Sequence, residues 1–319
     1  MAPALRARVR REVPAAAGVY LFRDEAGNPL YVGKSVNLRE RMLSHLAAHQ
    51  TDPASRNRHL AFSIHDFEVT VAAGELAALL LEDALIKQLR PRANTRQLDY
   101  AENCYVLLTT GDYPTCRIVE SNERGAGELF GPFRDRHFAA DLLAIIHRYF
   151  GLRACADRAP FRRSARYDLG SCSGPCRDAI TPEAYAIIVG RVEAFLRGEG
   201  AWIAGTLAET IGSAAGRLAF EEAAVLRDTS AFCRRFTRRQ RFAEAFKHGR
   251  VEVVERGTAG RSYRFERGAV ARIEAGGQAV AVPQELSQPP ADERFLLDRA
   301  HLVYDWLNRG RGAVRGDPA

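Results

Sequence analysis

Apolar and polar residues near the amino terminus fall into short runs that predict a β-hairpin. Residues 18–23 and 30–33 are rich in β-branched and aromatic side chains, which strands favour. Gly27 and Asn28 lie between these runs, and both residue types tolerate the positive φ of a tight turn. Residues 67–71 alternate between apolar and polar positions, so they predict a third strand.

Two stretches in the same region have helical periodicity. Asn37 suits an N-cap and Glu40 follows three residues later as a capping-box partner, so a helix is expected to run to about residue 48. Its apolar stripe comprises Leu38, Met42, His45 and Leu46. A longer apolar helix is predicted over residues 74–89.

The middle of the chain predicts a second group of elements. Strands are expected over residues 104–109 and 115–119, and an amphipathic helix over residues 137–150. A further helix over residues 181–197 precedes a helical hairpin whose end reads Leu218 to Asp228.

The last part of the chain predicts a small sheet and one helix. Residues 250–282 contain short alternating runs separated by glycines, which is typical of an antiparallel sheet. A closing helix is expected over residues 291–307. Residues 309–319 are rich in Gly, Arg and Pro and are expected to fray.

These elements predict an α+β protein. A small three-stranded antiparallel sheet flanked by helices is followed by a mostly helical region and a small carboxyl-terminal β/α unit. A length of 319 residues favours two or three domains. The predicted segments are an arm (1–13), the sheet-and-helix domain (14–98), a linker subdomain with cysteines (99–180), a helical region (181–245) and the terminal unit (246–319).

The charge balance favours a nucleic-acid partner without proving one. The formal net charge is +7 and the pI is near 9.3, which suits phosphate contacts. Arginines gather at two places: Arg90, Arg92 and Arg96 follow the apolar helix, and Arg234, Arg235, Arg238, Arg239 and Arg241 lie on a later helix. The second group fits a DNA contact and a solvated helix face about equally well.

The sequence indicates neither a membrane segment nor a targeting signal. No apolar run approaches transmembrane length. The arginine-rich start resembles a signal peptide, but Arg23 and Asp24 interrupt the apolar stretch that follows. We therefore expect a bacterial cytoplasmic protein with no membrane partner and no small-molecule substrate.

One ordered set of polar residues suits the hydrolysis of a phosphodiester. Its members are Tyr20, Tyr31, Lys34, Arg41, Glu82 and Asn94. Lysine occurs elsewhere only at positions 87 and 247, so Lys34 directly after Tyr-Val-Gly is less expected by chance. Glu82 lies among leucines, and a buried carboxylate needs a cation or hydrogen bonds; the alternative is an ordinary Glu on a solvated helix face.

The chemistry of this set is coherent on its own. Mg²⁺ keeps several waters, so one carboxylate such as Glu82 can suffice when the substrate supplies phosphate oxygens. A tyrosine has a pKa of about 10, which a neighbouring ammonium, guanidinium or metal lowers. Arg41 can bind two phosphate oxygens as a planar fork.

Together these segments resemble a GIY-YIG nuclease domain. The resemblance rests on Gly-Val-Tyr, Tyr-Val-Gly-Lys-Ser, Asn-Leu-Arg-Glu-Arg and the run from Leu79 to Asn94, and it covers residues 14–96. The chain is similar to the amino-terminal nuclease of the bacterial excinuclease component UvrC, and more closely to the short homologue Cho, which cuts on the 3′ side of a lesion. Leu129 to Phe133 also resembles a linker motif of that family.

The resemblance implies a role for each residue. Tyr31, helped by Lys34, would be the general base or would orient the attacking water. Tyr20 would position the nucleophile or phosphate; some family members are argued to use this tyrosine as the base instead. Arg41 would stabilise charge on the scissile phosphate, and Glu82 would hold one Mg²⁺ or Mn²⁺.

The remaining two positions differ in how well they fit the family. Asn94 would anchor the site structurally. His45 stands where the family usually has a further tyrosine. Its imidazole could donate to a phosphate, relay a proton or simply pack.

Three cysteines raise the question of a metal cluster. Cys172 and Cys176 lie on a predicted tight turn, with Cys155 upstream. Iron–sulfur and zinc sites usually have four protein ligands. Where the similar UvrC segment has another cysteine, this chain has Ser164. Either Ser164 or another group completes an iron–sulfur cluster site, or the cluster is lost and the fold survives without it. Cys104, Cys116 and Cys233 are expected to be structural.

The implied function is a Mg²⁺-dependent endonuclease of nucleotide excision repair. It would incise damaged double-stranded DNA on the 3′ side of the lesion, with the excinuclease component UvrB as partner and UvrA acting upstream.

Residues 218–228 resemble the UVR motif that contacts UvrB; an intramolecular hairpin is the alternative. No second acidic set suggests another active site, so one incision is expected. A stand-alone structure- or sequence-specific GIY-YIG endonuclease and a non-catalytic DNA-binding adaptor remain open.

Overall fold

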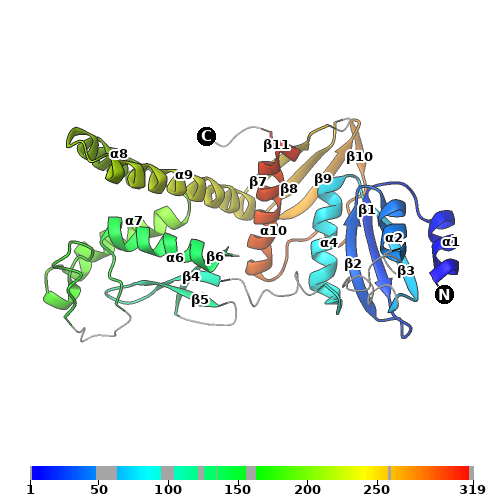
Figure 1. Ribbon diagram of the computed structural model, residues 1–319, viewed down its shortest axis with the longest axis horizontal. Coiled ribbons are helices and arrows are strands. Elements are labelled where there is room, and N and C mark those ends of the chain that lie inside the picture. The colour runs from blue at the N-terminus through cyan, green and yellow to red at the C-terminus, as the bar shows by residue number, and fades with distance from the viewer. Residues whose placement is uncertain are drawn as a thin grey trace. The chain divides into compact units, whose positions relative to one another are not determined.

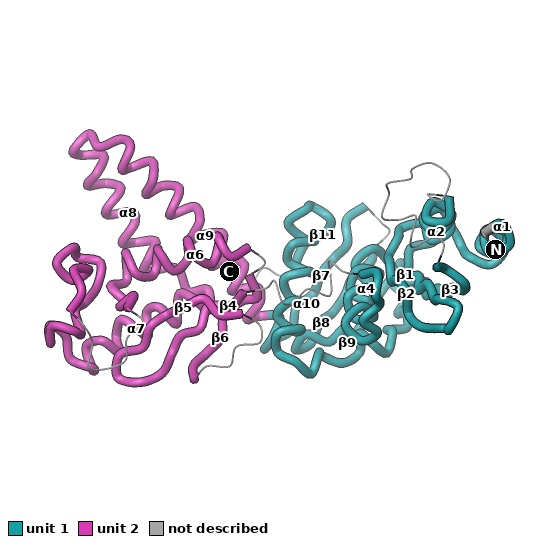
Figure 2. Tube along the Cα trace, turned by 60° about the horizontal axis from the view of Figure 1, so that its bottom comes forward, with its two compact units in different colours: residues 1–99, 246–319 teal, residues 100–245 magenta. Residues whose placement is uncertain are grey.

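The computed structural model describes residues 2–47, 63–94, 104–120, 126–133, 135–155, 163–257 and 260–315. The chain divides into two compact units, which Figure 2 colours separately: unit 1 comprises residues 1–99 and 246–319, and unit 2 comprises residues 100–245. Arg96, the predicted helix end at residue 48, the domain boundary at residues 98 and 99, and the last four residues lie outside the described part of the chain.

The first sheet of unit 1 has the predicted three antiparallel strands. Strands β1 (Gly18–Arg23), β2 (Pro29–Ser35) and β3 (Asp66–Val71) are arranged in the order β2-β1-β3. The central strand β1 is buried almost throughout, which explains its continuous apolar run. Helices α2 (Leu38–Ala47) and α4 (Glu75–Leu89) lie beside this sheet in Figure 1, confirming the predicted α+β class.

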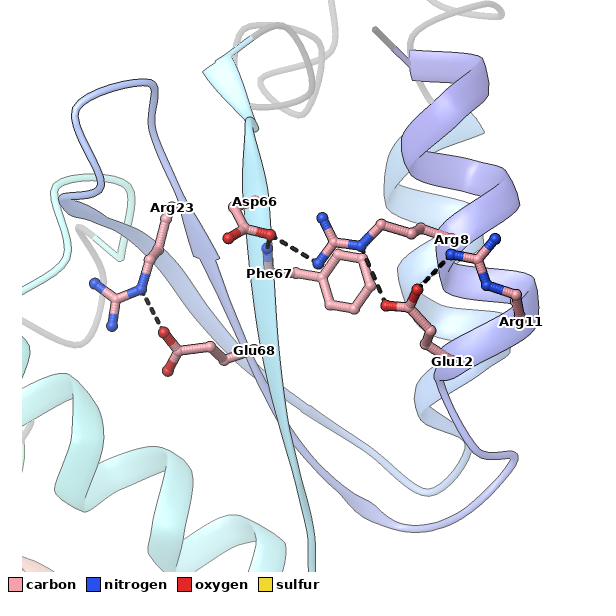
Figure 3. Close-up of polar contacts among 7 residues, drawn as sticks. All are labelled: Arg8, Arg11, Glu12, Arg23, Asp66, Phe67 and Glu68. Atoms are coloured by element: carbon pink, nitrogen blue, oxygen red, sulfur yellow. Dashed lines mark hydrogen bonds and ion pairs between the residues drawn. The ribbon is translucent and has the colours of Figure 1, made fainter.

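A helix occupies most of the predicted amino-terminal arm. In α1 (Ala2–Glu12), Leu5 and Val9 are buried in the core of the first sheet, as is Val13 just beyond the helix end. Figure 3 shows how the polar side of this helix meets β3: the Arg8 guanidinium lies 2.9 Å from Asp66 and over the Phe67 ring. The same view shows Glu12 pairing with Arg8 and Arg11, and Arg23 pairing with Glu68.

A second sheet belongs to unit 1 although it is distant in sequence. It contains β7 (Arg250–Glu255), β8 (Ser262–Glu266), β9 (Ala269–Ala275), β10 (Gln278–Val280) and β11 (Gly312–Val314), and its order is β10-β9-β8-β7-β11. The helix α10 (Glu293–Trp306) contacts α4. The prediction that residues 309–319 fray was wrong for residues 312–314, because β11 pairs with β7 in an antiparallel ladder.

Unit 2 combines a three-stranded sheet with helices around a large apolar core. Strands β4 (Cys104–Thr109), β5 (Cys116–Glu120) and β6 (Gly127–Phe133) are arranged in the order β5-β4-β6. The helices are α6 (Arg136–Ile145), which a π-helical turn continues to Phe150, α7 (Pro182–Leu196), α8 (Ala201–Gly216) and α9 (Phe220–His248), whose last three residues belong to unit 1. The segment expected to resemble a linker motif forms most of β6.

The turn of the α8–α9 hairpin lies inside the segment predicted to be helical. Leu218 adopts a φ of 58°, which is uncommon for a leucine, and α9 begins two residues later. In the described part of the chain, no helix is both long and apolar enough to span a membrane.

Candidate active site

Strand register brings the two tyrosines of the predicted set to one face of the hairpin. Tyr20 on β1 pairs with Gly33 on β2, and Phe22 pairs with Tyr31, so the phenols are diagonal neighbours. Their ring centroids lie 6.1 Å apart. Tyr20 is only 1% exposed, whereas Tyr31 is half-buried, so Tyr31 is the phenol that solvent reaches more readily.

Two glycines make this arrangement possible. A Cβ on Gly33 would come within 2.4 Å of the Tyr20 hydroxyl oxygen, and a Cβ on Gly18 would come within 2.3 Å of the Thr70 carbonyl oxygen. Gly33 therefore gives the Tyr20 ring its room, and Gly18 lets β3 approach β1. Both glycines belong to the Gly-Val-Tyr and Tyr-Val-Gly motifs of the sequence analysis. Their steric role depends on strand register and was not predicted.

His45 faces the tyrosines from α2. Its Nε2 lies 2.9 Å from the Tyr20 hydroxyl, and its ring centroid lies 5.5 Å from that of Tyr31. The side chain is buried, and burial lowers the pKa of His45 to about 4, with the Arg41 guanidinium acting in the same direction. The imidazole is thus neutral near pH 7 and shares one hydrogen bond with Tyr20, whose donor is set by the imidazole tautomer.

Glu82 reaches the end of the hairpin from the middle of α4. Its Oε1 accepts a hydrogen bond of 2.9 Å from the backbone N–H of Lys34. The carboxylate is buried, and burial raises its pKa, an effect that the Lys34 amide and ammonium oppose. The predicted acidic residue is therefore inward-facing and has one backbone donor from β2.

Asn94 anchors the outer edge of β2. Its Oδ1 accepts from the Val32 N–H, and its Nδ2 donates to the Val32 carbonyl, both at 2.8 Å. Because β2 is an edge strand, these bonds satisfy backbone groups that no further strand pairs. Asn94 thus fixes the strand that carries Tyr31.

Charges around the phenols act against one another. Burial raises the pKa of Tyr20 and of Tyr31; Glu82 adds to the rise at Tyr31, while the Arg41 guanidinium opposes it at both rings. Arg41 itself is exposed on α2. The structure therefore brings Tyr20, Tyr31, Arg41, His45 and Glu82 into one electrostatically coupled group, with both phenols protonated at neutral pH.

A divalent cation fits the donor chemistry at Glu82. The Lys34 N–H occupies Oε1, and among the described residues no hydrogen bond reaches the second carboxylate oxygen, Oε2. No group of three or more His, Cys, Asp or Glu side chains is arranged as a metal site in that part of the chain. Mg²⁺ accepts one protein carboxylate when water and phosphate oxygens supply its other ligands, whereas zinc prefers a fuller set of protein ligands.

The cysteine segment belongs to unit 2. Burial raises the pKa of the Cys172 thiol, and Cys155 and Cys176 are near enough to raise it further. The Arg153 guanidinium donates to the Cys155 sulfur at 3.4 Å. Ser164 Oγ instead accepts a backbone N–H from Arg166. The described residues do not assemble the predicted cysteines into a metal site, so a cluster stays a prediction.

Two family models match consecutive parts of this chain. Residues 16–95 match the UvrC-like GIY-YIG domain, and residues 103–195 match the middle domain of UvrC/Cho excinuclease. The first match contains every residue of the predicted catalytic set.

Curated relatives extend the match along the chain. UvrABC system protein C from Syntrophotalea carbinolica is 31% identical over 331 residues, covering 94% of this chain and 52% of that protein. The Aquifex aeolicus protein of the same name is 37% identical over 220 residues, covering 68% of this chain and 38% of its own length. The chain thus spans about half or less of the length of these relatives.

A solved structure also matches the first part of the chain. It is the GIY-YIG amino-terminal endonuclease domain of UvrC from Thermotoga maritima, bound to its catalytic divalent cation, magnesium. It is 30% identical, covers 30% of this chain and 99% of its own, and has a TM-score of 0.26. On the two family models and the curated relatives, the chain belongs to the UvrC family of excinuclease proteins, with a UvrC-like GIY-YIG domain followed by a UvrC/Cho middle domain.

Proposed function

We propose that the chain is a metal-dependent DNA endonuclease of nucleotide excision repair that incises the damaged strand on the 3′ side of a lesion. The observation that carries this proposal is a group of Tyr31, Arg41 and Glu82: the Lys34 N–H, on the strand of Tyr31, holds the buried Glu82 carboxylate at 2.9 Å, and the Arg41 guanidinium acts on both side chains. Phosphodiester hydrolysis needs a group to orient water, a cation for the phosphate and a carboxylate for a metal, and this group supplies all three.

Each side chain has a distinct task in this proposal. Glu82 is the metal ligand, and the Lys34 amide fixes its orientation by donating to Oε1. Tyr31 faces the substrate and orients the attacking water, while Arg41 binds the scissile phosphate as a planar fork. Tyr20 and His45 form a buried pair behind Tyr31 that fixes its environment.

Mg²⁺ or Mn²⁺ is the cation that this site suits. When bound, it would lower the pKa of water, neutralise charge on the leaving oxygen and favour the phenolate of a nearby tyrosine. Burial raises the pKa of Glu82, and a cation beside the carboxylate would lower it again by stabilising the charged form.

A stripe of arginines on α9 supports DNA as the substrate. Arg227, Arg234, Arg238 and Arg241 are exposed and recur at helical spacing, so they lie on one side of the helix. None of them pairs with a carboxylate among the described residues. At about 1.5 Å per residue the stripe is about 21 Å long, enough to follow about six base-pair steps of duplex backbone.

Salt-dependent binding tests this surface. Replacing Arg234, Arg238 and Arg241 by Gln should make the negative slope of log K against log salt shallower by about 2 to 3, because each phosphate contact contributes about −0.9. The matched control replaces Arg250, Arg272 and Arg315, which are exposed but already paired with glutamates, and should leave the slope nearly unchanged. Equal slopes for the two triple variants would exclude the stripe as a DNA contact.

The tip of the α8–α9 hairpin is the surface we propose for the excinuclease component UvrB. Leu218, Phe220 and Val225 are each at least 60% exposed there, and this tip projects from the rest of unit 2 in Figure 2. Exposed apolar side chains of this size commonly mark a protein contact. Ala223 and Leu226 of the same segment are instead buried in the core of unit 2.

Incision of a lesion-bearing duplex tests the proposed function as a whole. The damaged strand is labelled at its 5′ end and incubated with the chain, Mg²⁺, UvrA and UvrB, each present or omitted. We expect one cut on the 3′ side of the lesion that needs Mg²⁺ and both partner proteins. Cutting of undamaged DNA without these proteins would favour a stand-alone endonuclease, and binding without cutting would favour an adaptor. A bacterial cytoplasmic location would follow from the proposed partners.

A further inference from the structure

The helix that carries Glu82 begins without a cap of its own. Gly74 occupies the N-cap position of α4 and has no side chain to accept a first-turn N–H. Glu255, at the end of β7 and 180 residues away, takes that place: its Oε1 accepts the backbone N–H of Glu75 at 3.1 Å. A negative carboxylate at a helix amino terminus also complements the helix dipole.

The Glu255 carboxylate is itself held in position. The Tyr263 hydroxyl on β8 donates to Glu255 Oε2 at 2.8 Å, and Glu255 is 7% exposed. A Cβ on Gly74 would come within 2.4 Å of Glu255 Oε2 and 2.6 Å of the Tyr263 oxygen. Because Gly74 has no Cβ, the Glu255 carboxylate can approach the first turn of α4. The second sheet of unit 1 therefore contacts α4 closely at this point.

A second attachment holds the other end of the same helix. The Lys87 ammonium lies 2.6 Å from the Asp83 carboxylate and 2.8 Å from Asp298 on α10, and all three side chains are largely buried. Glu82 lies between Glu75 and Lys87, so the carboxyl-terminal part of unit 1 holds α4 on both sides of the proposed metal ligand. Figure 1 shows that α4 and α10 lie side by side.

We propose that Glu255 is a positioning residue for Glu82, and that residues 246–319 brace the metal-binding helix of the nuclease. This inference rests on the proposed function and assigns a role to a segment for which the sequence indicates none. The Glu255 cap keeps the first turns of α4 closed, and the Glu82 carboxylate then stays aligned with the Lys34 amide.

The expected effect is on metal use and turnover, not on DNA binding. Glu255→Ala should raise the Mg²⁺ concentration for half-maximal nicking about fivefold and lower kcat, while KM for DNA stays within about twofold, because one cap is removed and the arginine stripe is untouched. Glu255→Gln keeps an acceptor oxygen and should recover most of the difference. Glu252→Gln, on the same strand but paired with Arg315, is the matched control.

Two further variants separate positioning from general damage. Tyr263→Phe should have an effect of the same kind and should add in part to Glu255→Ala, because the Tyr263 oxygen also has a hydrogen bond of its own to the Ala77 backbone in the first turn of α4. Gly74→Ser, introduced together with Glu255→Ala and Tyr263→Phe, supplies a cap from the helix itself, because the two removals take away the two closest atoms and leave the flexible Arg261 side chain, 3.0 Å away, to move aside for the Cβ. We expect this triple variant to recover the wild-type Mg²⁺ dependence.

Hydrogen exchange completes the test because it needs no nuclease activity. In the full chain, amides of residues 75–82 should exchange about fivefold faster in Glu255→Ala than in wild type, and at the wild-type rate in Glu252→Gln. If residues 75–82 exchange faster in Glu255→Ala but the wild-type protein never nicks DNA, the positioning role of Glu255 is supported and the proposed function is refuted. Unchanged exchange together with unchanged Mg²⁺ dependence in Glu255→Ala would overturn the brace.

Discussion

Gly33 lies opposite Tyr20 in the β1–β2 ladder, so closely that a Cβ on Gly33 would come within 2.4 Å of the Tyr20 hydroxyl oxygen. That oxygen is hydrogen-bonded to His45, so the ring has little freedom to move away. The pairing of a glycine with a tyrosine thus determines how the two phenols and the imidazole meet.

Gly33→Ala is therefore expected to displace the Tyr20 ring and to lower the nicking rate by about tenfold or more, because a displacement of about 1 Å near a reacting group can cost that much. DNA binding should change little. The measurement is single-turnover nicking beside a filter-binding assay. Gly205→Ala on α8, where nothing lies within 4 Å of the added Cβ, is the control and should nick at the wild-type rate.

His45 should make stability depend on pH in the acidic range. Its pKa falls from 6.5 to about 4 on folding, so the unfolded chain binds more protons between these values. The free energy of unfolding therefore decreases as pH falls from about 6.5 to about 4, by up to about 3 kcal/mol, and this contribution is fully present above pH 6.5.

The measurement is urea unfolding of wild type and His45→Phe across that pH range. The unfolding free energy of wild type minus that of His45→Phe should decrease as pH falls, because the Phe side chain binds no proton. Curves that stay parallel from neutral pH to about pH 4 would show that His45 is not held neutral by the fold.

Asn94→Ala should destabilise unit 1 by about 1 to 3 kcal/mol, because it leaves the Val32 N–H and carbonyl without their partner in a buried edge. Nicking should fall as well, since Tyr31 is the residue before Val32. Urea unfolding measures the first effect. Asn308→Ala, an exposed position on the same unit, should be within about 0.5 kcal/mol of wild type.

Substitutions at the tip of the α8–α9 hairpin should affect UvrB binding, whereas substitutions in the core of unit 2 should affect stability. Phe220→Asp with Val225→Asp is expected to abolish capture by immobilised UvrB and to leave the melting temperature almost unchanged, because both side chains are exposed. Leu226→Ala should instead destabilise unit 2 by about 2 to 4 kcal/mol, since Leu226 is buried. Undiminished capture by the double Asp variant would exclude this contact.

The periodicity of apolar residues and the turn residues predicted those elements that depend mainly on their own sequence. The apolar run of β1, the turn residues after it and the long apolar α4 were all predicted within a few residues, because each depends on its own periodicity. The helix α1 was not predicted: Leu5, Val9 and Val13 recur at helical spacing, but the arginines between them resembled a leader segment.

Features that depend on distant partners could not be predicted in this way. A strand as short as β11 exists because β7 pairs with it, and the residues that form it have no strand signal of their own. The cap that Glu255 gives to α4 joins positions 75 and 255, and neither the acidic residue nor the glycine at position 74 predicts the other. In the candidate site, the residue types were predictable, whereas the Tyr20–His45 bond depends on how α2 faces the sheet.

Nicking by Glu82→Gln tests the central claim most directly. The variant keeps the size of the side chain and an oxygen for the Lys34 amide, but it removes the charge proposed to hold the metal. The assay compares wild type, Glu82→Gln and the exposed control Glu266→Gln on one damaged duplex with Mg²⁺, UvrA and UvrB, and DNA binding is measured in parallel. We predict that Glu82→Gln loses at least about a hundredfold in nicking rate while binding DNA like wild type; cutting by Glu82→Gln at the wild-type rate would contradict the proposed active site.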